Sequence, residues 1–436
     1  MFITVFHFKA VSGTISFMLL TYCYRIKPSV EQIVIMDSWL ELLRRHWNDA
    51  LGQRLDWLKR TRSPIDRYSI VSEPIGEIPE RVDYYTQQAA LKETKQLFPE
   101  YKNIWAESQQ FNLQRLDKAW KRWQFPSHDA QRGGRPRFKK PGELRSFVFP
   151  RVNCPKAGAF VENGILKLSR IGAMPIRLHR PLPDGFTLKQ ATVVKKADGW
   201  YVCVSMQDES VPSPLPLDNI KTVVGIDVGL KEFLTTSSGE TVPVVKPYRQ
   251  VQNHLARQQR FLSRKQKGSN GYKKQQNKIA RIHQRVGRIR ENFHYNTAHN
   301  LVNRYDLIAV EDLNLRGLAR TRLGKSILDV AWGSFISKLE AVAVKRGVHV
   351  VKVNPAGTTV ECSSCGAKVP KTLSIRTHEC TRCYAVIDRD ENAARNILQR
   401  ALNAVGLIVP AGGGLGDTQP VKPEAWGWNG VQLSLF

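Results

Sequence analysis

Residues 362–396 read CSSCGAKVPKTLSIRTHECTRCYAVIDRDENAARN. This stretch contains two C-x2-C pairs separated by fourteen residues, and the four cysteines are Cys362, Cys365, Cys380 and Cys383. Two turns that each carry a cysteine pair can supply the four thiolates of a tetrahedral structural zinc site. A redox C-x2-C motif would account for one pair and leave the other without a role. The spacing therefore favours a zinc ribbon at residues 362–383 that holds one structural Zn²⁺.

Two aspartates follow the ribbon at the predicted start of a helix. They are Asp388 and Asp390, and the helix is expected to continue to about residue 402. A carboxylate at a helix N-terminus often serves only as a cap for free N–H groups. Position alone therefore assigns neither aspartate a catalytic role, and the acids upstream in the chain are needed to decide.

Two upstream acids lie near the ends of apolar segments that read as strands. Asp227 belongs to the segment 223–229, and Glu311 belongs to the segment 307–312. Hydrolysis of a phosphodiester needs an activated water and neutralised phosphate oxygens, and two Mg²⁺ ions held by carboxylates supply both. We therefore expect Asp227, Glu311 and Asp390 to bind two catalytic Mg²⁺. Side-chain alternation sends Glu311 and Asp312 to opposite faces, so only one of the two should reach this site.

The composition indicates a polyanionic partner. The chain has 436 residues, with 66 Lys and Arg against 38 Asp and Glu, and a net charge of +28. Because excess charge of this size disfavours compaction, nucleic acid is the expected partner and an anionic membrane surface is the weaker alternative. No apolar run reaches the roughly 18 residues of a membrane span. We expect a cytoplasmic protein that associates with the nucleoid when it is bound to DNA.

Cysteine usage outside the ribbon is sparse. Cys23, Cys154 and Cys203 are scattered through strand-like segments. This pattern is typical of a reducing compartment, and it predicts no disulfide framework.

Two basic regions are candidate nucleic-acid contacts. Residues 248–292 hold thirteen Lys and Arg against one acid, and a break near residues 268–271 should divide them into two helices. Such one-sided charge favours phosphate contact over a solvated helix face. The other region, residues 132–140, reads as a flexible basic linker. The candidate contacts are Arg135, Arg137, Lys139, Lys140, Arg257, Arg260, Arg264, Lys273, Lys274, Lys278, Arg281 and Arg285.

The N-terminal half combines helices with short strands. A strand is expected at residues 19–26, and Ser29 and Gln32 then have the spacing of a capping box for a long amphipathic helix. Further helices are expected at residues 86–97 and 104–123. Short alternating segments follow between residues 146 and 206, with an Asp198-Gly199 hairpin signal, and they predict a small antiparallel β-barrel. In the C-terminal half a helix is expected at residues 327–345 and a strand at residues 348–353.

These features together resemble one family. GIDVG at 225–229, VEDLN at 310–314 and the ribbon with DRDENAARNI resemble the TnpB (OrfB-type) proteins of insertion sequences. Those proteins are RuvC-like nucleases of the RNase H fold, similar to type V CRISPR effectors. The resemblance implies that Asp227, Glu311 and Asp390 bind metal, and it favours Asp390 over Asp388. It also implies a guide RNA derived from the transposon end and a double-stranded DNA target. The sequence departs from the family at Tyr384, where a Gly is usual, and this change could alter the turn without affecting the zinc ligands.

The expected fold is a multidomain α+β protein with a helical bundle inserted in a β-barrel. Residues 18–28 and 132–210 form the wedge-like barrel, and residues 29–131 form the helical recognition domain. Residues 218–361 and 384–403 form an RNase H-like (RuvC) α/β nuclease domain that carries the ribbon. A flexible tail should occupy residues 404–436. The first 17 residues read as an extension from a misassigned start, with translation beginning at Met18.

The function that these features favour is RNA-guided, Mg²⁺-dependent cleavage of DNA by a protein encoded by a mobile element. A transposase that catalyses strand transfer could use the same three acids, because hydrolysis and transesterification use similar metal sites. A non-catalytic regulator that binds DNA through its zinc ribbon would fit the charge and the cysteines. It would leave the three acids unexplained.

Overall fold

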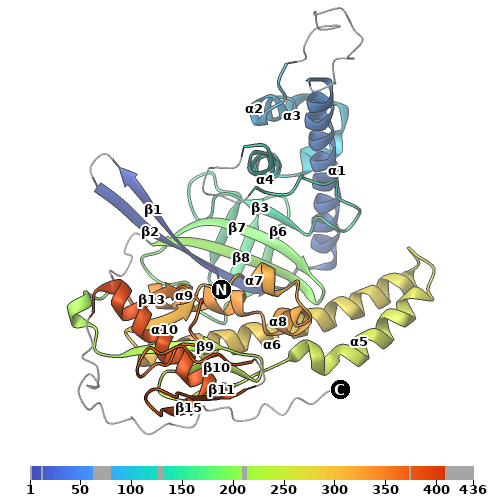
Figure 1. The fold of residues 1–436 in the computed structure, drawn as a ribbon. Helices are drawn as coiled ribbons and strands as arrows, with labels where there is room; N and C mark the ends of the chain where they lie inside the picture. The colour runs from blue at the N-terminus through green and yellow to red at the C-terminus, as the bar shows by residue number, and fades with distance from the viewer. Residues whose placement is uncertain are drawn as a thin grey trace, which may run out of the picture. The chain divides into compact units, whose positions relative to one another are not determined.

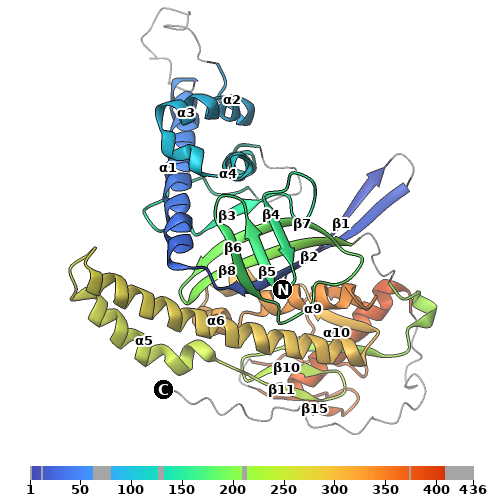
Figure 2. The same ribbon diagram turned by 180° about the vertical axis from the view of Figure 1, so that it is seen from behind.

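The computed structural model describes residues 2–10, 13–61, 80–125, 132–208, 214–372 and 375–407. The chain divides into two compact units, Met1–Ser210 and Val211–Phe436. Figures 1 and 2 show the ribbon from opposite sides. The predicted α+β fold with more than one domain is confirmed. Nearly all of the tail predicted at residues 404–436 lies outside the described residues.

The first unit is built on an eight-stranded antiparallel sheet in the order β3-β7-β8-β2-β6-β5-β4, and β1 also pairs with β2. A bridge between Val152 and Ala159 brings the chain after β3 next to β4, so the sheet is nearly closed. The strands are β1 (Phe2–Ala10), β2 (Gly13–Ile26), β3 (Ser146–Phe149), β4 (Ala159–Glu162), β5 (Ile165–Leu168), β6 (Gly172–Arg177), β7 (Thr187–Lys196) and β8 (Gly199–Asp208).

The register of β2 against β8 corrects one expectation about the cysteines. Cys23 and Cys203 are direct partners across these antiparallel strands, and a disulfide joins them. The prediction that the cysteines outside the ribbon form no disulfide is therefore wrong for this pair, while Cys154 is free. Two residues 180 positions apart meet only because the sheet sets their register, which residue spacing does not show.

The helices of the first unit follow the predicted pattern with one difference. Helix α1 (Val30–Thr61) starts at the predicted capping box, in which the backbone N–H of Gln32 donates to Ser29 Oγ over 3.2 Å. The helix expected at residues 86–97 is instead two short helices, α2 (Tyr84–Ala89) and α3 (Leu91–Leu97). The turn η1 (Pro99–Asn103) then leads to α4 (Ala106–Gln124), whose apolar face packs on α1.

The basic segment at residues 132–140 is not a free linker, because it is fixed against α1. The Trp47 indole Nε1–H donates to Arg137 O over 3.2 Å, and the Asn48 amide bonds both the N–H and the C=O of Lys139. The Lys139 ammonium lies 4.5 Å from the centre of the Trp47 ring. The prediction of flexibility was wrong because side chains about ninety residues away satisfy the backbone of this segment.

The second unit contains a five-stranded mixed sheet in the order β11-β10-β9-β12-β13. Strands β9, β10 and β11 pair antiparallel, whereas β12 pairs parallel with both β9 and β13. The strands are β9 (Val223–Val228), β10 (Glu232–Thr236), β11 (Thr241–Pro243), β12 (Leu307–Glu311) and β13 (His349–Val353), and a turn η2 (Leu217–Asn219) precedes them.

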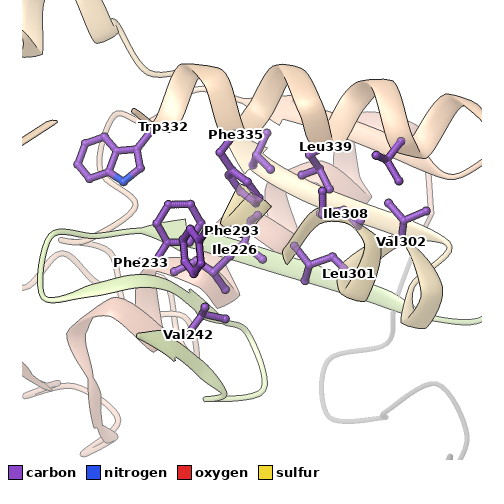
Figure 3. Packing of buried hydrophobic residues seen from close by; sticks show 14 of the residues in the cluster. Ile226, Phe233, Val242, Phe293, Leu301, Val302, Ile308, Trp332, Phe335 and Leu339 are labelled. Carbon is purple, nitrogen blue, oxygen red and sulfur yellow. The ribbon is translucent and has the colours of Figure 1, made fainter. Parts of the chain in front are cut away.

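Alternation along β9 and β12 divides the apolar residues between two faces of this sheet. Ile226, Ile308 and their neighbours pack against α6 (Asn270–Arg304) and α9 (Trp332–Val344), as Figure 3 shows. On the other face Leu307 and Ala309 pack against Ile397 of α10 (Arg389–Val405). The sheet is thus buried between helices on both faces, as apolar parallel strands require.

Two further features define the helical layer. The predicted basic run forms α5 (Pro247–Ser263) and α6, which lie side by side in both ribbon views (Figures 1 and 2). The buried Asp329 carboxylate accepts the backbone N–H groups of Tyr248 and Arg249 and so caps α5. The helix expected at residues 327–345 is divided at Ala331 into α8 (Gly324–Val330) and α9, after the short α7 (Leu315–Leu318).

Candidate metal centres

The strand register brings two of the predicted acids to one face of the sheet. Val310 is paired with Ile226 in the parallel β9–β12 ladder, so Glu311 and Asp227 follow on adjacent strands. Because Ile226 and Val310 face α6 and α9, Asp227 and Glu311 face α10. Asp390 lies in the first turn of α10. Three segments that are far apart in the sequence therefore bring acidic residues to the α10 side of the sheet.

The Asp227 carboxyl lies close enough to Glu311 and Asp390 to be affected by their charges. Burial raises the pKa of Asp227 well above its ordinary value, and the negative charges of Glu311 and Asp390 raise it further. Burial also raises the pKa of Glu311, while the hydrogen bond that Thr358 Oγ1 donates to it over 2.6 Å lowers that pKa. Either a bound proton or a bound cation offsets such a concentration of negative charge in a low-dielectric place.

Arginines supply positive charge to this acidic cluster. Arg389 donates to Asp390 Oδ1 from Nε over 3.0 Å and from Nη2 over 2.8 Å, while Arg376 Nη1 donates to Oδ2 over 3.1 Å. The Asp390 carboxylate thus contacts guanidinium groups rather than the other two acids. The donor set, three carboxylates from a strand, a strand and a helix, still fits hard divalent cations.

The two aspartates that the sequence analysis set aside have other positions. Asp388 is the N-cap of α10, and its Oδ1 accepts the N–H of Asp390 over 2.8 Å and that of Glu391 over 3.3 Å. Asp312 comes directly after Glu311, and both residues line a cavity together with Val310. The exclusion of Asp388 and Asp312 from catalysis stays a prediction.

Close contact between α10 and β9 sets the position of Asp390. A Cβ atom added to Gly225 would lie 2.1 Å from the carbonyl oxygen of Ala394, so only glycine permits this approach. On α10 itself, the Asn392 and Asn396 amides donate to Glu361 O over 2.8 and 2.7 Å and so join the helix to the start of the ribbon. The roles of Gly225, Asn392 and Asn396 were not predicted from the sequence. The two Asn residues, four positions apart on a buried helix face, were a usable signal.

The four cysteines form a compact cluster. Their sulfur atoms all lie within 4.8 Å of one another, and in the described part of the chain no other group of three or more Cys, His, Asp or Glu is this close. The Sγ atoms of Cys362 and Cys383 are 3.6 Å apart, and those of Cys365 and Cys380 are 3.5 Å apart. Zinc–sulfur bonds of about 2.3 Å in a tetrahedron place sulfurs about 3.8 Å apart, so the cluster fits zinc.

The backbone supports thiolate formation at one of the cysteines. The N–H groups of Cys383 and Arg382 point to Cys380 Sγ and lower the pKa of that thiol to about 6, whereas hydrogen bonds with the other cysteines raise the pKa of Cys383 to about 12. A thiolate is the form that binds zinc. The short strands β14 (Thr377–Glu379) and β15 (Val386–Asp388) hold the second turn in an antiparallel pair.

The two turns of the ribbon have the same backbone despite their different sequences. Gly366 N–H donates to Cys362 O over 2.8 Å, and Tyr384 N–H donates to Cys380 O over 2.9 Å. Both residues have positive φ, 73° for Gly366 and 58° for Tyr384. The substitution of Tyr for Gly therefore does not alter the turn, and the zinc ligands stay in place.

Most of the predicted nucleic-acid contacts lie on the surface. All eight of those on α5, α6 and the loop between them are exposed, and so are Arg135, Arg137 and Lys140. Lys139 is half-buried, and burial lowers its pKa together with the nearby charge of Arg115. Their contact with nucleic acid stays a prediction. Within the described ranges, no helix has both the length and the apolar character that crossing a membrane requires.

Comparison with family descriptions matches three parts of the chain. Residues 201–322 match a family described as "Probable transposase" (OrfB_IS605), and residues 332–397 match "Cas12f1-like, TNB domain". Residues 18–63 match a family described as "Helix-turn-helix domain".

Whole-chain relatives agree with these matches. A protein of Streptomyces pristinaespiralis named "Putative RNA-guided DNA endonuclease" is 31% identical over 393 residues, covering 87% of this chain and 89% of that protein. InsQ of Escherichia coli, with the same description, is 31% identical over 335 residues, covering 72% and 78%. A solved Cas12f1–sgRNA–target DNA complex is similar with a TM-score of 0.46 and 13% identity, covering 84% of this chain and 82% of that one.

Proposed function

Because the chain belongs to the OrfB/TnpB family, we propose that it is an RNA-guided, Mg²⁺-dependent DNA endonuclease encoded by a mobile element. The observation that carries the proposal is the convergence of Asp227, Glu311 and Asp390 on one face of the sheet. A regulator that only binds DNA has no need for three partly buried acids that repel one another.

The acids would hold two Mg²⁺ ions. When bound, these ions neutralise charge on the phosphate oxygens and activate a water molecule. Thr358 fixes the orientation of the Glu311 carboxylate by its hydrogen bond. Arg389 and Arg376 hold the Asp390 carboxylate in place, and a cation that binds Asp390 competes with them.

The sheet order supports an RNase H-like (RuvC) assignment for the second unit. In that reading β9 and β12 are adjacent parallel strands that carry the first two acids, and α10 covers the same face and carries the third. The ribbon precedes α10 directly and would set the direction from which Asp390 enters. The nearly closed sheet of the first unit would be the wedge-like domain.

The partners we propose are a guide RNA from the transposon end and a double-stranded DNA target. Cytoplasmic DNA would be the setting for cleavage. The exposed cations of α5 and α6 support this proposal, and they can be tested by salt dependence. Charge reversal of Arg257, Arg260 and Lys274 should reduce the slope of log affinity against log salt by roughly 0.7–0.9 per lost contact. An unchanged slope would show that α5 and α6 are only a solvated surface.

The decisive experiment is cleavage of plasmid DNA by protein purified with its own RNA. Free double-strand ends in Mg²⁺ are expected, and sequencing of the co-purified RNA should identify a discrete guide. Joined DNA products would instead favour strand transfer by a transposase. Binding of DNA without any cleavage would favour the regulator.

A further inference from the structure

A pocket of about 430 Å³ lies in the first unit, where β2 ends and α1 begins. Its lining includes Pro28 and Ile33 beside that junction, with Gly199 and Trp200 from the start of β8. The wall also contains three cations, which are Arg25, Lys27 and Arg177. Pockets of roughly 300–1,000 Å³ hold small organic molecules, and the absence of any acid from this lining favours an anionic one.

Two of these cations are paired with each other across the sheet. Arg25 of β2 and Arg177 of β6 are direct partners in the antiparallel ladder, and both residues are exposed (Figure 2). Direct partners point to the same face of a sheet, where like charges destabilise the pairing. Lys27 follows Arg25 by two residues and adds a third positive charge to the same pocket. A repulsive arrangement that the fold does not need is expected where a ligand of opposite charge binds.

The three cations form no ion pair with any acid of the described residues. Arg25 Nη2 donates to a backbone carbonyl, Asp198 O, over 3.0 Å, and this bond fixes the guanidinium beside the turn that precedes β8. The Asp198 carboxylate itself accepts from Tyr201 Oη over 2.9 Å. By contrast, Lys195 on the neighbouring strand β7 is paired with Asp37 over 2.5 Å. The pocket therefore holds one oriented guanidinium and two further cations that are able to bind a ligand.

We infer that this pocket binds one unpaired nucleotide of the guide RNA. Its phosphate accepts from the guanidinium groups of Arg25 and Arg177, which suit the oxygens of a phosphate better than ammonium groups do. Pro28 and Ile33 offer an apolar surface to its sugar and base. A base enters a pocket only when it is out of the stack, and folded RNA presents such nucleotides in loops and bulges, whereas duplex DNA must first be opened. The inference rests on the proposed function and does not depend on the cations of α5 and α6.

A scan with neutral phosphates locates the nucleotide. Synthetic copies of the co-purified RNA each carry one methylphosphonate on a 2′-deoxy nucleotide, and their affinity for the full-length protein is compared with that of the matched phosphodiester. One unpaired position should weaken binding by the wild type about tenfold, because hydrogen bonds to a charged group are lost. Arg25→Gln/Arg177→Gln should bind unmodified RNA about ten- to a hundredfold more weakly and should be insensitive to that position. An abasic nucleotide there should also weaken binding by the wild type.

Arg145→Gln/Lys189→Gln is the matched control, because both residues are exposed cations of the first unit that do not line the pocket. This variant also loses two charges, and it should keep the sensitivity of the wild type at the critical position. The inference is overturned if the control loses that sensitivity, if no position is silent in the pocket variant alone, or if the abasic nucleotide has no effect.

Thermal unfolding of the RNA-free protein shows whether the arginine pair is instead structural. The Arg177 side chain donates no hydrogen bond within the described residues, so Arg177→Gln relieves repulsion and should raise Tm by about 1–4 °C while it weakens RNA binding. A fall in Tm would show that the pair stabilises the sheet, and it would overturn the inference.

A DNA arm separates the two nucleic acids. The same scan is applied to the target DNA with guide-loaded protein, and no DNA position should depend on Arg25 and Arg177. A DNA position in place of an RNA position would overturn the assignment to RNA. A discrete RNA that binds without any such position refutes the pocket alone, whereas protein that purifies without RNA refutes the proposed function.

Discussion

The cysteine cluster and the acidic cluster are assembled in opposite ways. Each ribbon turn contributes two thiols, and all four sulfurs are already within 4.8 Å. The acids come from three separate elements, and Asp390 is held by guanidinium groups. Local turns thus preassemble a soft-ligand site, whereas the carboxylate site exists only when the whole second unit is folded.

The largest effect is expected from breaking the ribbon. Cys365→Ser should abolish binding of about one zinc per chain and unfold the ribbon, because zinc binding contributes roughly 10–16 kcal/mol in small zinc domains. Elemental analysis and limited proteolysis measure the two losses. Cys154→Ser changes the free cysteine of the first unit and should alter neither. Metal-replete wild type without zinc would contradict the assignment.

Removal of an acid should abolish activity without unfolding the protein. Asp227→Asn, Glu311→Gln and Asp390→Asn should each lower the cleavage rate roughly 10²–10³-fold or more, and the triple variant should be no worse. RNA and DNA binding should persist, because phosphate affinity comes mainly from Lys and Arg. Asp388→Asn keeps the helix cap and should still cut. Cutting by Asp390→Asn beside an inactive Asp388→Asn would show that the wrong aspartate was chosen.

Replacement of Asp227 by Asn should also change the stability of the folded protein. Asp227→Asn should raise the free energy of unfolding at neutral pH by about 0.5–2 kcal/mol without divalent ions, because it removes a buried charge that Glu311 and Asp390 repel. The pKa of Asp227 is higher in the folded state than in the unfolded state. The wild type therefore becomes more stable as the pH falls through the folded-state pKa. The advantage of the variant should therefore shrink toward acid pH. Denaturant unfolding at several pH values measures this, and a less stable variant at neutral pH would refute it.

The smallest effect concerns the two ribbon turns. Tyr384→Gly should stabilise the ribbon by about 1 kcal/mol, since a side chain at positive φ costs about that much. Gly366→Ala should destabilise it by a similar amount. Zinc content should not change in either. Thermal unfolding with saturating zinc provides the measurement, and a loss of stability in Tyr384→Gly would show that the exposed ring makes contacts of its own.

Local sequence patterns predicted the features that depend on residues close together in the chain. Cysteine spacing predicted a cluster that the structure confirms. The capping box at Ser29 also begins its helix as predicted.

Features that depend on register or distant hydrogen bonds could not be predicted. The Cys23–Cys203 disulfide requires the β2–β8 register, and docking of residues 132–140 requires Trp47 and Asn48 of α1. Nothing near Asp390 in the sequence indicated that Arg376 would hold its carboxylate. Ala331 ends one helix and begins another through its φ of 56°, which residue type does not predict.

The junction between the ribbon and α10 limits how the chain length can vary. Asp388 is both the last residue of β15 and the N-cap of α10, so no spacer separates the two elements. One inserted residue at this point would turn Asp390 by about 100° around the helix axis and direct its carboxylate away from Asp227. Insertions between the two cysteine pairs would lengthen a loop and leave this angle unchanged. Natural relatives should therefore differ in length inside the ribbon and keep an invariant count of residues from its last cysteine to the third acid.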